Sequence, residues 1–222
     1  MGVILQHAID VTSSSKAKKI AEESIKGGAD WLEAGTTLIK IEGLKVVSEL
    51  KKCFSMTPIV ADMKTLDMGE LEVSSAVKHG ANLVMISGAA PDDTILEAMR
   101  TGKSLNAKIM VSLLGVRNPL ERAMELEKQG IDYLVLHAAV DEKIRPDFPK
   151  LVSALFSLVK IPIAVGGGIS EDNVRSLVLA GARVIIVGRG ITLSGNPYLA
   201  TLKIKKAISE AESQLSQNTS RY

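Results

Sequence analysis

The chain has almost no cysteine, few aromatic residues and no long hydrophobic run, and each shortage excludes a class of protein. A single cysteine, Cys53, among 222 residues excludes an internal disulfide and a cysteine-rich zinc site. Aromatic residues make up only 3% of the chain, which leaves little material for a surface that stacks nucleic-acid bases. No apolar run approaches the roughly 18 residues that a membrane-spanning helix requires.

The charge is also close to balanced. Lys and Arg number 27 against 25 Asp and Glu, and the resulting net charge of +2 is too small to indicate a nucleic-acid-binding surface. Residues 1–6 have no basic segment ahead of their apolar stretch, so we expect no signal peptide. We therefore predict a soluble cytoplasmic protein that binds neither nucleic acid nor a membrane.

Short runs rich in β-branched residues alternate with longer amphipathic stretches along the whole chain. The runs predicted to be strands are 3–9, 31–33, 58–62, 83–86, 108–111, 133–136, 162–165 and 184–187. The clearest helical patterns are 15–26, 69–79, 120–129 and 171–180. Strands separated by helices must pair in parallel, because the helix carries the crossover connection.

Eight strands in this length give about 28 residues for each unit, the size of one βα element in a (β/α)8 barrel. We predict a single-domain α/β protein, a (β/α)8 TIM barrel over residues 1–213, followed by a flexible tail at 214–222 that is rich in Ser, Gln and Asn. The alternative, a doubly wound open sheet, would require a Gly-x-Gly-x-x-Gly turn after the first strand. The chain has Asp-Val-Thr-Ser at 10–13 instead.

Charged residues stand at the carboxyl ends of the predicted strands, where the active sites of such barrels lie. Asp10, Glu33, Asp62 and His137 end the first, second, third and sixth strands, and Lys64 follows two residues after Asp62. Side chains two apart on a strand face the same side, so Asp62 and Lys64 are expected to lie together. His7 has the opposite parity to Asp10 and is expected to face the helices.

Each candidate also has a structural explanation. Asp10 would cap the first helix, Glu33 would be a solvated loop residue, and His137 would be a core histidine. Asp62 and Lys64 would form an ion pair at the barrel mouth. We favour a site because six of the eight strand ends carry a candidate group, the glycines after the last two strands included.

Glycines follow the last two strands. Gly166, Gly167 and Gly168 come after the seventh strand, ahead of a helix expected to start near Ser170, and Gly188 with Arg189 follows the eighth. The loops after strands seven and eight form the usual phosphate site of this fold, where free backbone N–H groups face the anion. We predict a phosphorylated sugar substrate held by Gly167, Gly168, Gly188 and Arg189.

The predicted mouth carries too much negative charge for one cation. Asp10, Glu33, Asp62 and Asp67 surround the single Lys64, and four confined carboxylates do not all stay ionised without added cations. Mg²⁺ commonly takes one or two carboxylates and completes its coordination with water and substrate oxygens. Beside a phosphosugar it would act as a Lewis acid on a ketone and its enediolate.

Three segments carry a family resemblance. Residues 61–70, Ala-Asp-Met-Lys-Thr-Leu-Asp-Met-Gly-Glu, resemble the Asp-x-Lys-x-x-Asp signature of the orotidine-monophosphate decarboxylase superfamily. The Lys-Thr-x-Asp-x-Gly continuation, together with residues 33–43 and 164–169, resembles its 3-hexulose-6-phosphate synthases. The resemblance runs from Leu5 to about Pro197. It implies aldol addition of ribulose 5-phosphate to formaldehyde, giving arabino-3-hexulose 6-phosphate, and the reverse reaction.

The resemblance also implies roles for individual residues. Glu33 and Asp62 would bind Mg²⁺, with Asp10 close by, and Lys64 would hydrogen-bond the enediolate oxygens. His137 would be the acid–base catalyst. In this superfamily the residue at the position of Asp67 reaches into the neighbouring subunit's site, which implies a homodimer with shared active sites.

Two other functions remain open. Glu33 stands where metal-free orotidine-monophosphate decarboxylases carry lysine, so it favours the metal-dependent branch, which includes 3-keto-L-gulonate-6-phosphate decarboxylase. Thr65 and the absence of arginine shortly after His137 favour the synthase within that branch. A non-catalytic phosphosugar-binding barrel is the third interpretation, but a binding protein would have no use for Lys64 flanked by two acids.

The chain departs from the synthase pattern in two places. Ser112 stands at the end of the fifth strand, where the synthases carry an acid. The stretch 138–146 after His137, which we expect to close over the substrate, is poorer in glycine than in the family. Both departures concern the part of the site that would receive the aldehyde.

Overall fold

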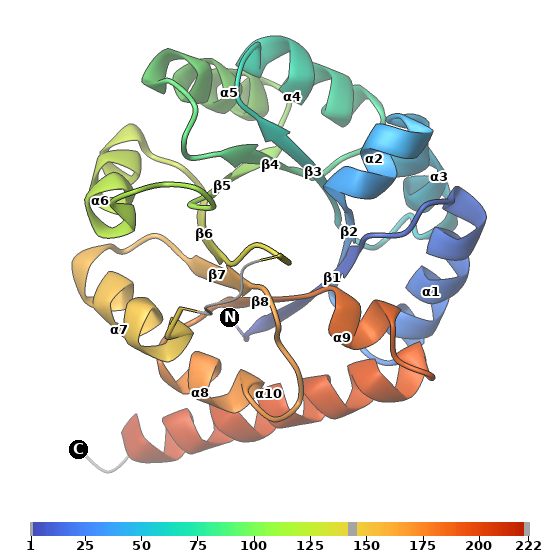
Figure 1. Cartoon of the computed structure of the whole chain (residues 1–222), viewed down its shortest axis with the longest axis vertical. Helices are drawn as coiled ribbons and strands as arrows, with labels where there is room; N and C mark the ends of the chain where they lie inside the picture. The colour runs from blue at the N-terminus through green and yellow to red at the C-terminus, as the bar shows by residue number, and fades with distance from the viewer. Residues whose placement is uncertain (1, 142–145, 220–222) are drawn as a thin grey trace.

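The computed structural model describes residues 2–141 and 146–219, and in it eight parallel strands close into one barrel (Figure 1). Each strand pairs with the next one in the chain, and β8 closes the ring on β1. The predicted single-domain (β/α)8 barrel is therefore confirmed. The strands are β1 (Ile4–Ile9), β2 (Trp31–Ala34), β3 (Ile59–Thr65), β4 (Leu83–Ser87), β5 (Lys108–Ser112), β6 (Tyr133–His137), β7 (Ile163–Gly166) and β8 (Val184–Val187).

Helices surround the barrel and cover its outer face (Figure 1). They are α1 (Ser14–Lys26), α2 (Thr36–Glu42), α3 (Lys45–Cys53), α4 (Gly69–Lys78), α5 (Asp92–Ser104), α6 (Pro119–Gln129), α7 (Phe148–Leu158), α8 (Val174–Leu179), α9 (Arg189–Thr192) and α10 (Pro197–Thr219). Helix α6 shows how the sequence sets these boundaries. Proline stands at its first position and Gly130 adopts the left-handed conformation just past its end, with φ of 82°.

The hydrophobic core has two layers because each strand is buried on both faces. One layer packs the outer face of the strands against the helices, and the other fills the barrel interior. The interior layer includes Ala8, Val60, Met85, Met110 and Val135. Trp31 and Tyr133 belong to the same layer, and their rings meet edge to face with centroids 5.6 Å apart. The barrel interior is a packed core, and the predicted charged residues lie at its carboxyl mouth.

His7 lies between the strands and the helices, as its parity predicts. The side chain is fully buried, and its ring nitrogens hydrogen-bond with Ser24 Oγ of α1 at 2.8 Å and Thr192 Oγ1 of α9 at 3.1 Å. Burial lowers the pKa of His7 to about 3, so the ring stays neutral in the folded protein. His7 is a structural residue that ties β1 to two helices.

The structure corrects one helix boundary and adds detail at the carboxyl end. The helix after β7 was expected over 171–180 with a start near Ser170, but α8 begins at Val174. Asn173 accounts for the delay, because its side chain accepts from the Ser170 N–H at 3.0 Å and donates to the Gly168 carbonyl at 3.0 Å, which holds a turn ahead of the helix. Helix α10 continues to Thr219, so residues 214–219 of the expected tail are helical; their flexibility stays a prediction.

No helix in the described part of the chain is long and apolar enough to cross a membrane.

Candidate active site at the barrel mouth

Five of the predicted site residues interact electrostatically at the carboxyl end of the barrel: Asp10, Glu33, Asp62, Lys64 and His137. Strand register brings the first three together, because Glu33 of β2 pairs with Ala8 of β1 on one side and Val60 of β3 on the other. Asp10 then follows β1 and Asp62 lies two residues beyond Val60 on the same face.

Asp62 and Lys64 form an ion pair that a third residue completes. Lys64 Nζ donates to Asp62 Oδ2 and, at 2.8 Å, to Thr36 Oγ1. The Thr36 hydroxyl in turn donates to the same Asp62 oxygen at 2.7 Å. Asp62 is buried, whereas the Lys64 side chain is 31% exposed, so the ammonium group lies between the buried carboxylate and the open mouth.

An irregular backbone places Lys64 there. The pairing of β3 with β4 shifts register between Asp62 and Thr65, and Lys64 has a left-handed φ of 49°. Residues other than glycine adopt this conformation at a cost, and such strain is concentrated at functional sites. At this irregularity the Lys64 side chain turns back over Asp62, while β3 continues to Thr65.

Glu33 is a carboxyl group in a poorly solvated position. It is 3% exposed, and Gln6 Nε2 donates to its Oε2 at 2.5 Å from one layer deeper in the barrel. Burial, followed by the charges of Asp62 and Asp10, raises the pKa of Glu33 to about 8. The interpretation of Glu33 as a solvated loop residue is therefore wrong.

Asp10 stands at the rim of the same cluster. Its side chain is exposed to solvent at the mouth, but the neighbouring protein atoms reduce its solvation. This desolvation and the nearby Asp62 charge raise its pKa, against the opposing effects of Lys64 and the Thr37 N–H. It does not cap the first helix, because Ser13 occupies the N-cap position of α1.

Two carboxylates at the mouth fit a divalent cation. Asp62 Oδ1 is buried and has no hydrogen-bond partner, although Oδ2 of the same group has two. Among the described residues no group of three or more His, Cys, Asp or Glu side chains is placed to hold a metal. Glu33 and Asp62, the two predicted ligands, are both buried and their charges interact. A pair suits Mg²⁺, which takes one or two carboxylates and fills its remaining positions with water and substrate oxygens.

His137 is the last residue of β6, and it interacts electrostatically with the Asp62–Lys64 ion pair. Burial, followed by the Lys64 charge, lowers the pKa of His137, while Asp62 has the opposite effect. Its Nδ1 is buried without a hydrogen-bond partner. A neutral imidazole with an unused nitrogen can accept a proton from a bound molecule.

The loops after β7 and β8 pack against each other beside His137, which pairs with Gly166 in the sheet. Gly167 has a φ of 113°, and a Cβ there would lie 2.9 Å from the Ala138 carbonyl oxygen. A Cβ on Gly190 would lie 2.7 Å from the Ile169 oxygen, so the two loops approach too closely for side chains. The short helix α9 opens at Gly188 with exposed Arg189 as its first residue, an arrangement typical of phosphate sites in this fold.

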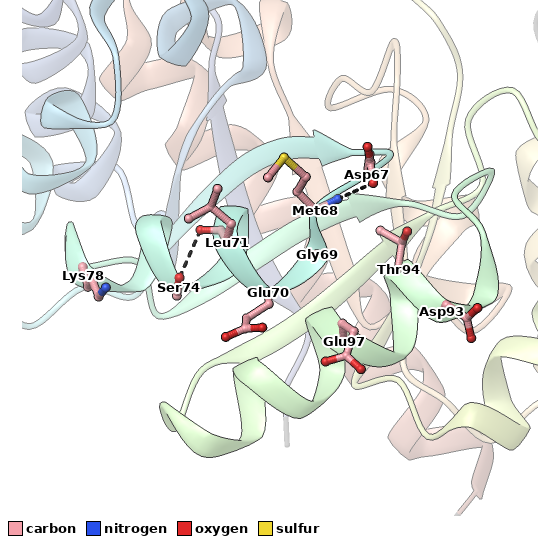
Figure 2. Close-up of a pocket in the computed structure, with 10 residues that line it drawn as sticks. All are labelled: Asp67, Met68, Gly69, Glu70, Leu71, Ser74, Lys78, Asp93, Thr94 and Glu97. Carbon is pink, nitrogen blue, oxygen red and sulfur yellow. Dashed lines mark hydrogen bonds between the residues drawn. The ribbon is translucent and has the colours of Figure 1, made fainter.

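Asp67 does not join the cluster within one chain. It is exposed, and its Oδ1 accepts from the N–H of Met68 at 2.7 Å. Figure 2 shows it at the edge of an open groove of about 660 Å³ between α4 and α5, which neither Asp62 nor Lys64 lines.

Two polar residues of the site, Gln6 and Thr36, were not predicted from the sequence. Gln6 shares the inward parity of Asp10, and a buried glutamine on an interior strand face was a signal that could have found it. Thr36 lies inside the stretch 33–43 that carries the family resemblance. The chain differs from the synthase pattern at two positions, and the structure describes one of them fully. Ser112 is buried at the end of β5. In the loop after His137, residues 142–145 lie outside the described part of the chain.

The fold and the cluster of charged residues define an enzyme of the barrel class. Its charged site and the glycine-containing loops after β7 and β8 lie at the same end of the barrel. The profile of the orotidine 5'-phosphate decarboxylase/HUMPS family matches residues 4–204, and the chain belongs to this family.

Individual relatives agree with this assignment. The chain is 35% identical to a 3-hexulose-6-phosphate synthase of Mycobacterium gastri over 205 residues, which cover 92% of this chain and 99% of the relative. It matches the crystal structure of a 3-hexulose-6-phosphate synthase from Salmonella typhimurium with a TM-score of 0.89 and 28% identity, over 94% and 99% of the two chains. A crystal structure of KGPDC from Streptococcus mutans matches with a TM-score of 0.86 and 26% identity, over 93% and 97%. The predicted resemblance and the prediction of an enzyme of the lyase class are confirmed.

Proposed function

We propose that this enzyme is a Mg²⁺-dependent aldolase that joins D-ribulose 5-phosphate to formaldehyde, giving D-arabino-hex-3-ulose 6-phosphate, and that it catalyses the reverse cleavage. The observation that carries the proposal is the pair Glu33 and Asp62 beside Lys64, with one buried Asp62 oxygen unpartnered. Similarity to synthases over nearly the whole chain supports it. We place this activity in the cytoplasm.

Glu33 and Asp62 would hold the metal. When bound, Mg²⁺ would supply Lewis-acid stabilisation for negative charge on the C1 and C2 oxygens of the sugar. Lys64 donates hydrogen bonds to the same oxygens, and Asp62 and Thr36 hold its ammonium group toward them.

His137 moves the proton. The neutral imidazole takes a proton from C1 of ribulose 5-phosphate, and the electron pair of that C–H bond enters the enediolate. C1 then attacks the formaldehyde carbon and a C–C bond forms. The imidazolium returns its proton to the former aldehyde oxygen, so the reaction needs no oxidant or reductant.

The other predicted residues bind and orient the substrate. The N–H groups of Gly167, Gly168 and Gly188 and the guanidinium of Arg189 hold the phosphate, which fixes C1 near His137. Asp10 lies within the field of Asp62 and Lys64 and would contact the sugar.

We propose further that the enzyme works as a homodimer with shared sites. Three apolar side chains around Asp67, those of Leu66, Met68 and Leu71, are each more than half exposed. Burial of this apolar surface against a second copy would stabilise the pair and carry Asp67 to the partner's Lys64.

One assay tests the activity. The protein is incubated with ribulose 5-phosphate, ¹³C-formaldehyde and Mg²⁺, and NMR follows the label. We expect it in C1 of a hexulose phosphate, with loss of the product in EDTA and recovery on addition of Mg²⁺. Full activity in metal-stripped protein would contradict the metal dependence. CO₂ release from 3-keto-L-gulonate 6-phosphate, without the aldol product, would instead identify the decarboxylase.

A further inference from the structure

The Thr36 hydroxyl lies between two charged site residues, Asp62 and Lys64. It does not cap the helix to which Thr36 belongs. It donates to Asp62 Oδ2 at 2.7 Å and accepts from Lys64 Nζ at 2.8 Å. Thr36 is the first residue of α2, but Gly35 is the N-cap, and the Gly35 carbonyl accepts from the Ile39 N–H. The hydroxyl is therefore used toward the site.

The consequence of these contacts falls on the Asp62 carboxylate. Thr36 and Lys64 both engage Oδ2, and Oδ1 is left buried without any partner. Two donors on the same oxygen restrict rotation of a carboxylate more than one donor does, so Thr36 and Lys64 together fix the direction of Oδ1. Without the hydroxyl, Lys64 alone would hold Asp62, and the carboxylate could rotate.

The chain delivers Thr36 to this position through a close approach of two segments. Gly35 donates its N–H to the Ile9 carbonyl at 3.2 Å, and a Cβ at Gly35 would lie 2.2 Å from Asp10 Oδ1. The start of α2 therefore lies directly against the end of β1, and the Thr36 side chain extends over Asp62 on β3.

We propose that Thr36 is a positioning residue whose hydroxyl fixes the Asp62 carboxylate and the Lys64 ammonium group, so that Asp62 Oδ1 is presented to a divalent cation. This inference rests on the proposed function, because it assigns Asp62 to the metal. Thr36 itself touches neither the metal nor the reacting carbons.

The test compares Thr36→Val, which replaces the hydroxyl with a methyl group, with Thr36→Ser, which keeps the hydroxyl. Thr36→Ala removes the hydroxyl by another route if the valine variant folds poorly. Thr57→Val is the matched control, since it makes the same change ahead of the amino end of β3. Circular dichroism and thermal melting establish the fold of each variant. Mn²⁺ affinity is measured by electron paramagnetic resonance without substrate, and kcat and KM are measured separately.

We expect Thr36→Val and Thr36→Ala to weaken Mn²⁺ binding and lower kcat by roughly 10- to 100-fold, as is usual for residues that orient metal ligands. KM for the phosphosugar should change far less, because the phosphate loops are untouched. Thr36→Ser and Thr57→Val should resemble the wild type.

Wild-type Mn²⁺ affinity and kcat in Thr36→Val would overturn the proposal. So would equal losses in Thr36→Val and Thr36→Ser, because the hydroxyl would then not be the cause. A crystal structure of Thr36→Val gives a result that needs neither metal nor substrate: Asp62 should be rotated, and an unchanged Asp62–Lys64 pair would also refute the assignment. A wild type that binds Mn²⁺ but makes no hexulose phosphate would refute the proposed function alone.

Discussion

Individual residues at the mouth of this barrel carry charge in places where water is scarce. Glu33 lies among buried groups, and its pKa is raised because burial disfavours the ionised form and ionisation would place a third negative charge near Asp62 and Asp10. Lys64 supplies one compensating charge, and Arg189 lies exposed at the start of α9, after β8. Single substitutions can therefore test the acids and the proposed phosphate-binding loops separately.

Arg189→Ala should raise KM for the phosphosugar without a comparable fall in kcat. Loss of one charge-assisted contact is worth roughly 1.5–3 kcal/mol, or about 10- to 150-fold in kcat/KM. Steady-state kinetics with varied ribulose 5-phosphate measure the change. Arg183→Ala, which removes an exposed arginine before the opposite end of β8, is the control. Unchanged kcat/KM in Arg189→Ala would place the phosphate elsewhere.

Ionisation of Glu33 should destabilise the metal-free protein as the pH rises. The folded-state pKa of about 8 lies above the ordinary value of 4.5, so the folded state holds a proton that the unfolded state has already released. The stabilisation is complete below pH 4.5 and is lost on approach to pH 8, by an amount on the order of a few kcal/mol.

Urea unfolding at pH 5 and pH 8, in EDTA, measures this loss. Glu33→Gln cannot ionise, so its stability should fall less over the same interval. Mg²⁺ should stabilise the wild type most at the higher pH, because metal binding displaces the proton. Parallel pH profiles for the two proteins would contradict the raised pKa.

Among the elements, the first turn of α2 contacts the site directly. It lies against the end of β1 and brings Gly35 and Thr36 to Asp10 and Asp62. Gly35 allows the helix to approach Asp10 this closely. Its φ of −66° is accessible to any residue, so glycine is required here because it has no side chain and not because of its backbone conformation.

Gly35→Ala should therefore lower activity more than a surface substitution does. The added Cβ would lie 2.2 Å from Asp10 Oδ1 and 3.0 Å from the Ile9 carbonyl oxygen, so Asp10 and the start of α2 must shift. We expect a loss of about 1–3 kcal/mol in stability, the usual cost of overpacking, and a fall in kcat. Chemical unfolding and steady-state assays measure both. Gly195→Ala, with nothing within 4 Å of its Cβ, should change neither.

At the scale of the whole molecule, Asp67 lies apart from Asp62 and Lys64 within one barrel, although the three residues belong to one short sequence motif. Asp67 lies at the groove between α4 and α5, beside exposed apolar side chains (Figure 2). Lys64 instead contacts Asp62 and Thr36 at the mouth. A twofold dimer would reunite Asp67 and Lys64 across an isologous interface.

Mixing inactive Lys64→Ala with inactive Asp67→Ala protomers should restore activity if sites are shared. In a mixed dimer one site receives both defects and the other receives neither. With equal amounts and random exchange, half the dimers are mixed, so about a quarter of wild-type sites should return. Native mass spectrometry confirms the exchange. Exchange without recovered activity would mean that Asp67 acts within its own chain.

Local patterns in the sequence were sufficient to predict the fold and the main charged residues. The alternation of strand and helix patterns depends on neighbouring residues only, and strand parity correctly placed His7, opposite in parity to Asp10, toward the helices. The helix after β7 was predicted too long, because the side-chain hydrogen bonds of Asn173 hold a turn that apolar periodicity does not reveal.

Tertiary structure decided how these residues act on one another. The contact of Thr36 with Asp62 depends on how α2 packs over β3, and the left-handed backbone of Lys64 depends on a shift in the pairing of β3 with β4. The raised pKa of Glu33 requires burial and two acids from other strands. Each of these effects depends on distances between segments far apart in the chain, which local sequence patterns do not specify, whereas the period of a strand or helix is a property of the segment itself.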